Sequence, residues 1–101
     1  MYAVLSRFAV RADRRVDFAV FAQRYAAESL RDESGVVEVA FVQDEGDPGP
    51  FYAYEVYCDR GAYEAHLEGR MFKGAMTTFA AMLAGPPVEL STGPTVARVT
   101  R

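Results

Sequence analysis

Two stretches in the middle of the chain carry large apolar side chains at both odd and even positions. They are VVEVAFVQ, residues 36–43, and FYAYEVYC, residues 51–58. Their β-branched and aromatic residues predict strands, and successive side chains of a strand point to opposite faces of its sheet. An antiparallel sheet with one wet face would alternate apolar and polar residues. Both faces of this sheet are therefore expected to be covered.

The segment that joins the two predicted strands is rich in turn residues. Residues 44–50, DEGDPGP, contain two glycines, two prolines and three acidic residues. Glycine and proline favour tight turns, and acidic side chains bond to nearby backbone in them. We therefore expect an antiparallel hairpin.

A strand and a long helix are predicted before the hairpin. Residues 2–10 alternate like a strand, and Asp13 is expected to cap a helix that runs from about Arg14 to about Arg31. Gly35 is expected to end this helix as its C′ residue. Helical spacing predicts a buried face. Its residues are Val16, Val20, Gln23, Ala27 and Leu30, widened by Phe18, Phe21 and Tyr25.

Two helical segments and a strand are predicted after the hairpin. Asp59 is expected to cap a helix over about 60–68, and a second segment spans about 70–84, before a glycine and a proline. A final strand, interrupted near Gly93-Pro94, is expected in the tail that follows. The order strand, helix, strand, strand, helix, strand predicts a ferredoxin-like, split βαβ fold of the α+β class. This fold has an antiparallel sheet with helices on one face.

The second apolar face of the sheet needs a cover that the helices cannot supply. Left open, it would expose an apolar patch of several hundred Å², on the order of the largest found on monomers. The same face of a second copy would cover it in a two-fold homodimer. Alternatively, the long C-terminal tail folds back over it within one chain. The length of 101 residues fits a single domain over residues 1–101.

Charge and composition exclude several classes of function. The net charge is −3, and the basic residues are interleaved with acidic ones, whereas nucleic-acid binding needs clustered positive charge. No apolar run reaches the roughly 18 residues of a membrane span, and the first residues lack the order of a signal peptide. Cys58 is the only cysteine, so no internal disulfide is possible. A cytoplasmic protein that binds neither nucleic acid nor membrane is expected.

Residues 51–66, FYAYEVYCDRGAYEAH, resemble a motif of the antibiotic biosynthesis monooxygenase (ABM) family. The Glu33-Ser34-Gly35 turn is similar to a turn of the same family, and the order of elements fits nearly the whole chain. The resemblance implies one ABM domain that pairs into a dimeric α+β barrel. The residues that match the family pattern are Phe51, Tyr54, Glu55, Tyr57, Asp59, Ala62, His66, Phe72, Gly85 and Pro86.

The resemblance implies a monooxygenase that works without a metal or another cofactor. The substrate would be an electron-rich aromatic, such as a quinol or a polyketide-like molecule, which itself supplies electrons to O₂. His66, the only histidine, would be the catalytic base that removes a phenolic proton. The alternative is a structural histidine held by a carbonyl or a carboxylate.

Six further side chains are candidates for contact with the substrate. Hydroxyl groups among them could donate hydrogen bonds to a bound oxygen, and methionines could make the pocket adaptable to flat ligands. Each could instead be a core or interface group. The six are Ser6, Tyr52, Tyr54, Met71, Phe72 and Met76.

Glu55 lies inside a covered sheet and therefore needs a partner. Arg7 on the first predicted strand could form a structural ion pair with it, and acid/base work is the alternative. Which face of the sheet Glu55 occupies stays open at this point. The chain lacks the motifs of a protein metal site.

Departures from the family pattern keep two other functions open. Met71 stands where many members have a second histidine, and the chain has neither the Asn nor the Trp that some branches use. One alternative is an isomerase of a small carbonyl or phosphorylated metabolite, with His66 moving a proton. The other is a non-catalytic dimeric module that binds small molecules.

Overall fold

The predicted hairpin forms the middle and one edge of a four-stranded sheet. In the computed structural model, which describes residues 1–101, β2 (Val36–Gln43) and β3 (Pro50–Tyr57) pair antiparallel. On the other side of β3 lies β1 (Tyr2–Ala9), followed by β4 (Val88–Pro94), which gives the antiparallel order β2-β3-β1-β4.

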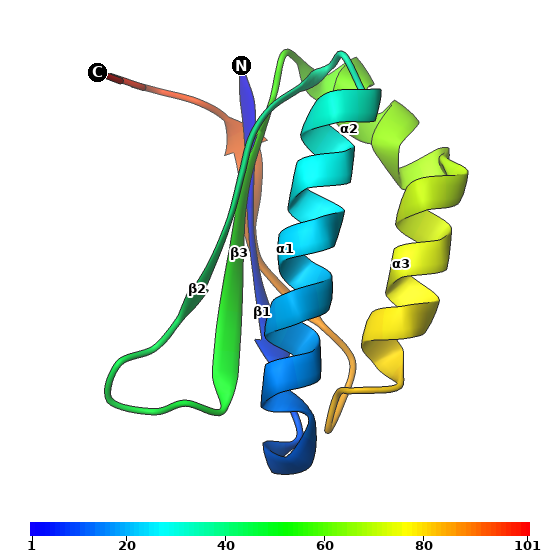
Figure 1. Ribbon diagram of the computed structural model, residues 1–101. Coiled ribbons are helices and arrows are strands. Elements are labelled where there is room, and N and C mark those ends of the chain that lie inside the picture. Colours follow the sequence, from blue (N-terminus) through cyan, green and yellow to red (C-terminus); the bar gives the residue numbers. More distant parts are fainter.

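All the helices lie on one face of this sheet (Figure 1). The helices are α1 (Arg15–Asp32), α2 (Arg60–Glu68) and α3 (Arg70–Ala80), and a 3₁₀ turn, Ala12–Arg14, precedes α1. The predicted ferredoxin-like α+β fold is confirmed.

Phenylalanine rings from both layers form the centre of the core. Phe18 of α1 and Phe79 of α3 are fully buried, and their ring centroids lie 4.9 Å apart. The Phe18 ring also lies 4.7 Å from that of Phe51 on β3, and Phe79 lies 5.4 Å from Phe8 on β1. Tilted aromatic pairs at these distances are favourable beyond the area they bury. They hold α1 and α3 against the sheet.

The predicted buried face of α1 is wrong in part. The buried residues are Phe18, Ala22, Tyr25 and Ser29. Val16, Val20 and Leu30 are instead 77%, 60% and 53% exposed. The helix carries two apolar rows on opposite sides, and the row with the large aromatic rings is the one that faces the sheet.

The helix ends agree with the sequence at one cap and differ at two places. Asp59 caps α2 as predicted, since its carboxylate accepts a hydrogen bond from the backbone N–H of Ala62 at 2.8 Å. Asp13 lies in the 3₁₀ turn, and no side chain caps α1. The second segment ends at Ala80 rather than near residue 84, because the chain turns there and carries Met82 into the core.

Gly35 has a different role from the predicted one. No glycine in the chain has a positive φ, so Gly35 does not end α1 in the left-handed conformation. A Cβ atom added at this position would lie only 2.6 Å from the Cβ of Ala62 on α2. Glycine is needed here because α2 packs directly against the backbone that leads into β2.

Gly35→Ala is expected to lower the free energy of unfolding by about 1–3 kcal/mol through overpacking. Urea denaturation would measure the loss, and the same substitution should cost less in an Ala62→Gly background, where the clash is absent. Gly74→Ala on α3 is the matched control. A Cβ there meets nothing within 4 Å, so it should stabilise α3 by about 0.5–1 kcal/mol. Equal losses at both glycines would contradict the close-packing explanation.

The face of the sheet that carries no helices is only partly covered. Leu5, Val42 and Val88 share this face by strand register and are 37%, 55% and 48% exposed. Arg98 of the tail reaches across to Glu38 on β2, with 2.9 Å between Nη2 and Oε1. The tail therefore crosses one end of the face before it projects away from the sheet (Figure 1). The alternative that it covers the whole face is wrong.

No helix combines the length and the apolar character that crossing a bilayer requires.

Candidate functional site

Glu55 faces the helices, which settles the question that the sequence left open. It lies opposite the buried Val4 in the sheet register, and it shares its face of β3 with the buried Phe51 and Tyr57. Arg7 lies opposite Tyr52 instead and is exposed on the other face. The expected ion pair between Glu55 and Arg7 is therefore wrong, because Arg7 stands an odd number of positions from Val4 and points away from it.

The Glu55 side chain lines a hollow of about 290 Å³ between the sheet and the α2–α3 pair. Three of the six predicted contact residues meet there: Ser6 on β1, and Phe72 and Met76 on α3. The rest of the lining is largely apolar apart from Glu89. The remaining residues are Val4, Phe8, Tyr63, Leu67, Pro87 and Glu89.

Tyr57 holds the Glu55 carboxylate in place. Its hydroxyl donates a hydrogen bond to Oε2 of Glu55 at 2.5 Å. Burial raises the pKa of Glu55 above its ordinary value of 4.5, the Tyr57 bond and the nearby His66 oppose this rise, and Glu33 adds to it. The pKa of Tyr57 is itself raised, first by burial and then by the Glu55 charge. Tyr57 therefore keeps its proton and acts as the donor, while Glu55 exchanges a proton closer to neutral pH than an exposed carboxylate does.

His66 on α2 is 3% exposed and is held from both sides. Its Nδ1 lies 2.8 and 3.0 Å from the two carboxylate oxygens of Glu33, and its Nε2 lies 2.8 Å from the hydroxyl of Tyr25. Burial raises the pKa of Tyr25, so its hydroxyl keeps the proton and can donate it to Nε2. Nδ1 then carries the ring proton and donates to Glu33, because an ionised carboxylate can only accept.

His66 stands directly behind the hollow rather than in it. It is absent from the lining, but its ring packs against Tyr57 and Phe72, with centroids 5.4 and 5.2 Å away. Tyr57 holds Glu55, and Phe72 forms part of the wall. The catalytic role of His66 stays a prediction, and its contacts fit a residue that fixes the position of others.

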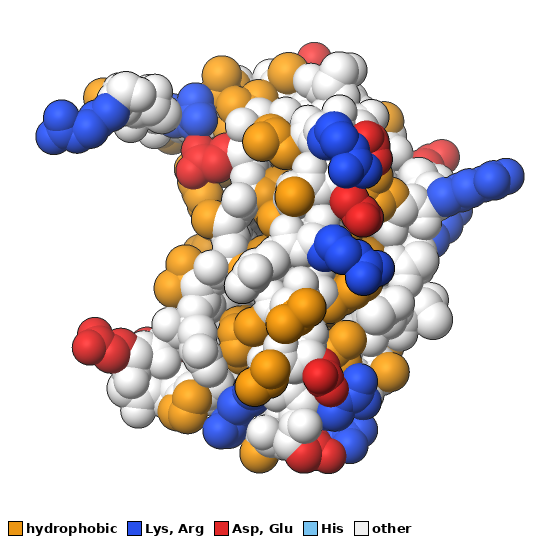
Figure 2. Space-filling model, in the orientation of Figure 1, with side chains coloured by type: hydrophobic (Ala, Val, Ile, Leu, Met, Phe, Trp, Pro, Cys, Tyr) orange, Lys and Arg blue, Asp and Glu red, His pale blue; other side chains and the backbone are white.

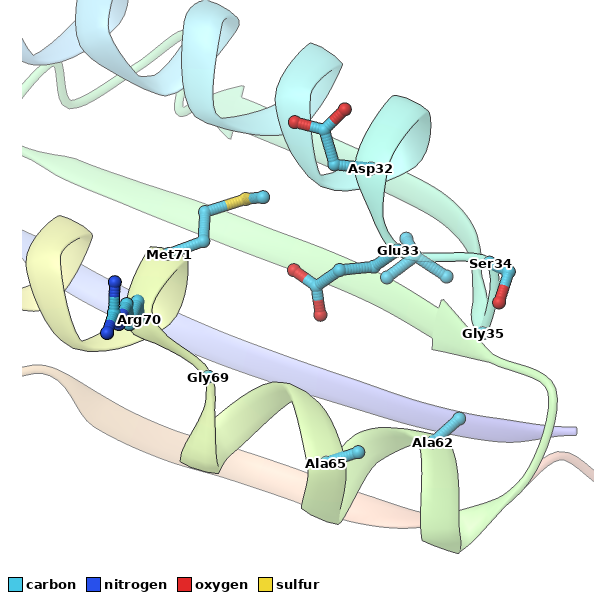
Figure 3. A pocket seen from close by; sticks show the side chains of 10 residues that line it. Asp32, Glu33, Ser34, Gly35, Ala62, Ala65, Gly69, Arg70 and Met71 are labelled. Atoms are coloured by element: carbon cyan, nitrogen blue, oxygen red, sulfur yellow. The ribbon is translucent and has the colours of Figure 1, made fainter.

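The remaining predicted contact residues lie elsewhere. Tyr52 and Tyr54 are on the open face of the sheet. Met71 lines a second hollow of about 530 Å³ at the end of α1. Figure 3 shows that the Glu33 carboxylate extends into this hollow between the start of β2 and the start of α3.

Sequence reasoning did not identify the partners Tyr25, Glu33 and Tyr57 in these roles. Tyr57 could have been found, since it stands two positions from Glu55 and shares its face of the strand. Glu33 belongs to the Glu33-Ser34-Gly35 turn, which is similar to a turn of the family. Nothing in the sequence indicates that Tyr25 reaches His66. No group of three or more His, Cys, Asp or Glu side chains is placed to hold a metal ion.

A ferredoxin-like sheet, with helices on one face and a half-buried carboxylate in a hollow beneath them, defines a class of small α+β proteins. Comparison with known protein families identifies the family within this class. The family model for antibiotic biosynthesis monooxygenase matches residues 1–78, and the chain belongs to this family. No protein of curated function matches the sequence.

Solved structures from several organisms share the fold of this chain. A protein from Nitrosomonas europaea, provisionally named an antibiotic biosynthesis monooxygenase, is 25% identical with a TM-score of 0.86, over 96% of this chain and 100% of that one. One from Caulobacter crescentus, with the same provisional name, is 21% identical with a TM-score of 0.87, over 95% and 90%. Rv0793 from Mycobacterium tuberculosis is 18% identical with a TM-score of 0.84, over 98% of both chains.

Proposed function

We propose that this protein is a monooxygenase that oxidises a small electron-rich aromatic, such as a quinol, in the hollow beside Glu55. The observation that carries the proposal is a half-buried carboxylate of raised pKa in a largely apolar hollow, held by a tyrosine that keeps its proton. In this proposal no metal or organic cofactor takes part. The family to which the chain belongs supports the reaction class.

Glu55 is the proton acceptor in the proposed reaction. It takes the proton of a phenolic hydroxyl, and the resulting phenolate passes electrons to O₂ far more readily than the neutral phenol. For a hydroquinone, one oxygen atom of O₂ enters the ring and the other leaves as water, so that the product is a hydroxyquinone. The ring supplies all four electrons. A base of raised pKa suits this work, because proton transfer is most efficient when the pKa lies near the working pH.

The walls of the hollow fit a flat and mostly apolar guest. Phe72 and Met76 offer an aromatic ring and a polarizable thioether. The Ser6 hydroxyl can donate a hydrogen bond to the second oxygen of the substrate. At about 290 Å³, the hollow is at the lower limit of ligand pockets, which hold roughly 300–1,000 Å³. We therefore expect a substrate of one or two rings.

His66 takes a positioning role in this proposal. It packs behind Tyr57 and Phe72, and its own nitrogens are engaged by Glu33 and Tyr25. It keeps the side chains of Tyr57 and Phe72 in place against the hollow while Glu55 takes up the proton of the substrate. This assignment replaces the expectation that the imidazole itself is the base.

We further propose that two copies pair through their open sheet faces into a homodimer. The exposed Leu5, Val42 and Val88 support this, together with the half-buried Tyr52 and Tyr54 on the same face. Burying this face would remove an apolar patch from water. The cytoplasmic location stays a prediction.

Oxygen consumption by the purified protein tests the proposed reaction. A panel of one-ring and two-ring hydroquinones in an oxygen electrode should include at least one that is consumed with O₂ in a ratio of one to one. The product from ¹⁸O₂ should carry one labelled oxygen. Consumption of a small carbonyl compound under argon would favour the isomerase instead. Tight binding of the panel with no turnover would favour the non-catalytic module, and either result would overturn the monooxygenase.

A further inference from the structure

The outward side of α1 carries a row of apolar residues that nothing in the chain covers. Val16, Val20 and Leu30 are exposed, as is Ala27. This row lies opposite the buried row of Phe18 and its neighbours on the 18-residue helix. Figure 2 shows hydrophobic side chains gathered over α1, with charged side chains mostly on the side toward α3. We call Val16, Val20, Gln23, Ala27 and Leu30 the α1 row.

The α1 row has the spacing of a helix-pairing seam and is nearly symmetric about its centre. Its members follow one another at intervals of four, three, four and three residues, as the a and d positions of a heptad do. Gln23 stands in the middle, with Val16 and Leu30 each seven positions away. A glutamine amide both donates and accepts, so it can bond to an identical amide across a two-fold axis.

Charged residues beside the row favour an antiparallel pair over a parallel one. Asp17 and Arg31 lie near opposite ends of the same flank. In an antiparallel pair Asp17 meets the partner's Arg31 twice, whereas a parallel pair would set this charged flank against the partner's opposite flank and leave both charges without such a partner. Arg24, near the centre, lies 3.7 Å from Glu28 of its own helix and over the Phe21 ring, which offsets its charge. The other flank carries the small residues Ala19 and Ala26, which permit close approach.

We propose that α1 is a contact between copies of this chain, in which two α1 helices pair antiparallel about a two-fold axis near Gln23. The helices and the open sheet face lie on opposite sides of the domain (Figure 1), so this contact is independent of the proposed sheet-face dimer and would link such dimers. A helix of 18 residues is only about 27 Å long. Two such helices bury less than the roughly 1,200 Å² of a stable interface, so the α1 contact alone is weak.

Cross-linking at single cysteines tests this contact, because it captures weak pairs. All variants carry Cys58→Ser, which removes the one native cysteine, exposed in this structure. With a short bis-maleimide, Gln23→Cys should form covalent dimers at least about tenfold faster than Thr77→Cys. Thr77 is the control position, because it is also exposed but lies on α3. Adding Val20→Glu to the Gln23→Cys chain should return its rate to that of Thr77→Cys.

A mixture of two variants tests the direction of the pair. When Val16→Cys and Leu30→Cys chains of different tag length are mixed, the mixed dimer should form at least about fivefold faster than either self-dimer. An excess of self-dimers would overturn the antiparallel arrangement. Equal rates for Gln23→Cys and Thr77→Cys would overturn the contact itself. Neither result would touch the oxygen assay or the sheet-face dimer.

Discussion

Glu55→Gln is expected to lower quinol-dependent oxygen uptake by about 10²–10⁴-fold, the range that general acid–base catalysis typically contributes. Glutamine keeps the shape of the side chain and can still accept the hydrogen bond from Tyr57, but it cannot take up the phenolic proton. Initial rates in the oxygen electrode, with the substrate found in the panel, would measure the loss. Substrate binding should be retained, because Phe72 and Met76 are unchanged.

The pH dependence of the rate should identify the same group. Burial raises the pKa of Glu55 above 4.5, and only the ionised carboxylate can accept the proton. The wild-type rate should therefore rise with pH as Glu55 ionises, with a midpoint above 4.5. Glu45→Gln, at an exposed carboxylate in the loop between β2 and β3, is the matched control and should leave both rate and midpoint unchanged.

Folding of the Glu55→Gln variant can be checked by the sign of its stability change. The folded state binds the Glu55 proton more tightly than the unfolded chain does, so the contribution of Glu55 to stability is fully present below pH 4.5 and is lost as pH rises through the raised pKa. Glutamine does not ionise, so the variant does not lose this contribution. Its free energy of unfolding relative to that of the wild type should therefore increase as the pH rises through the raised pKa of Glu55. A folded variant with wild-type oxygen uptake would exclude Glu55 as the base.

The fold could be predicted because its signals are local. Each strand has β-branched or aromatic residues, the hairpin has its turn residues, and α2 has its cap at Asp59. The buried face of α1 was mistaken because both of its rows have helical spacing. Periodicity locates apolar rows, but it does not say which row meets the sheet. The Phe18 row is chosen because its rings fit between Phe8, Phe51 and Phe79, and this depends on the other elements.

The candidate site could be predicted in its location but not in its connections. The motif in residues 51–66 contains both Glu55 and His66. Of the predicted contact residues, Ser6, Phe72 and Met76 do line one hollow with Glu55. The face of Glu55 follows once β1 and β3 are placed in register, because Val4 and Phe8 mark the buried side. The His66 partners, in contrast, lie 33 and 41 positions away in the sequence. Such contacts depend on how α1 and α2 pack against each other, and no local sequence pattern predicts this packing.

His66→Ala is expected to lower the free energy of unfolding by about 3–5 kcal/mol, because it truncates a buried aromatic ring and removes the hydrogen bonds at both of its nitrogens. The substitution leaves the Glu33 carboxylate and the Tyr25 hydroxyl without their partner and opens a cavity behind Tyr57 and Phe72. Tyr25→Phe removes only one hydrogen bond and leaves Nε2 of His66 without a donor, so it should lower the free energy of unfolding by about 1–3 kcal/mol. Because both act on one network, the double variant should lose less than the two losses added together. Urea denaturation of the four proteins gives this cycle.

His66→Gln separates a positioning role from the originally expected catalytic one. The glutamine amide can donate to Glu33 and accept from Tyr25, so it should recover part of the stability that His66→Ala loses. It cannot act as a base near neutral pH. If His66 positions Tyr57 and Phe72, the variant should keep oxygen uptake within about tenfold of wild type, with the pH midpoint of Glu55 still visible. A loss as large as that of Glu55→Gln, in a variant as stable as Tyr25→Phe, would return the role of base to the imidazole.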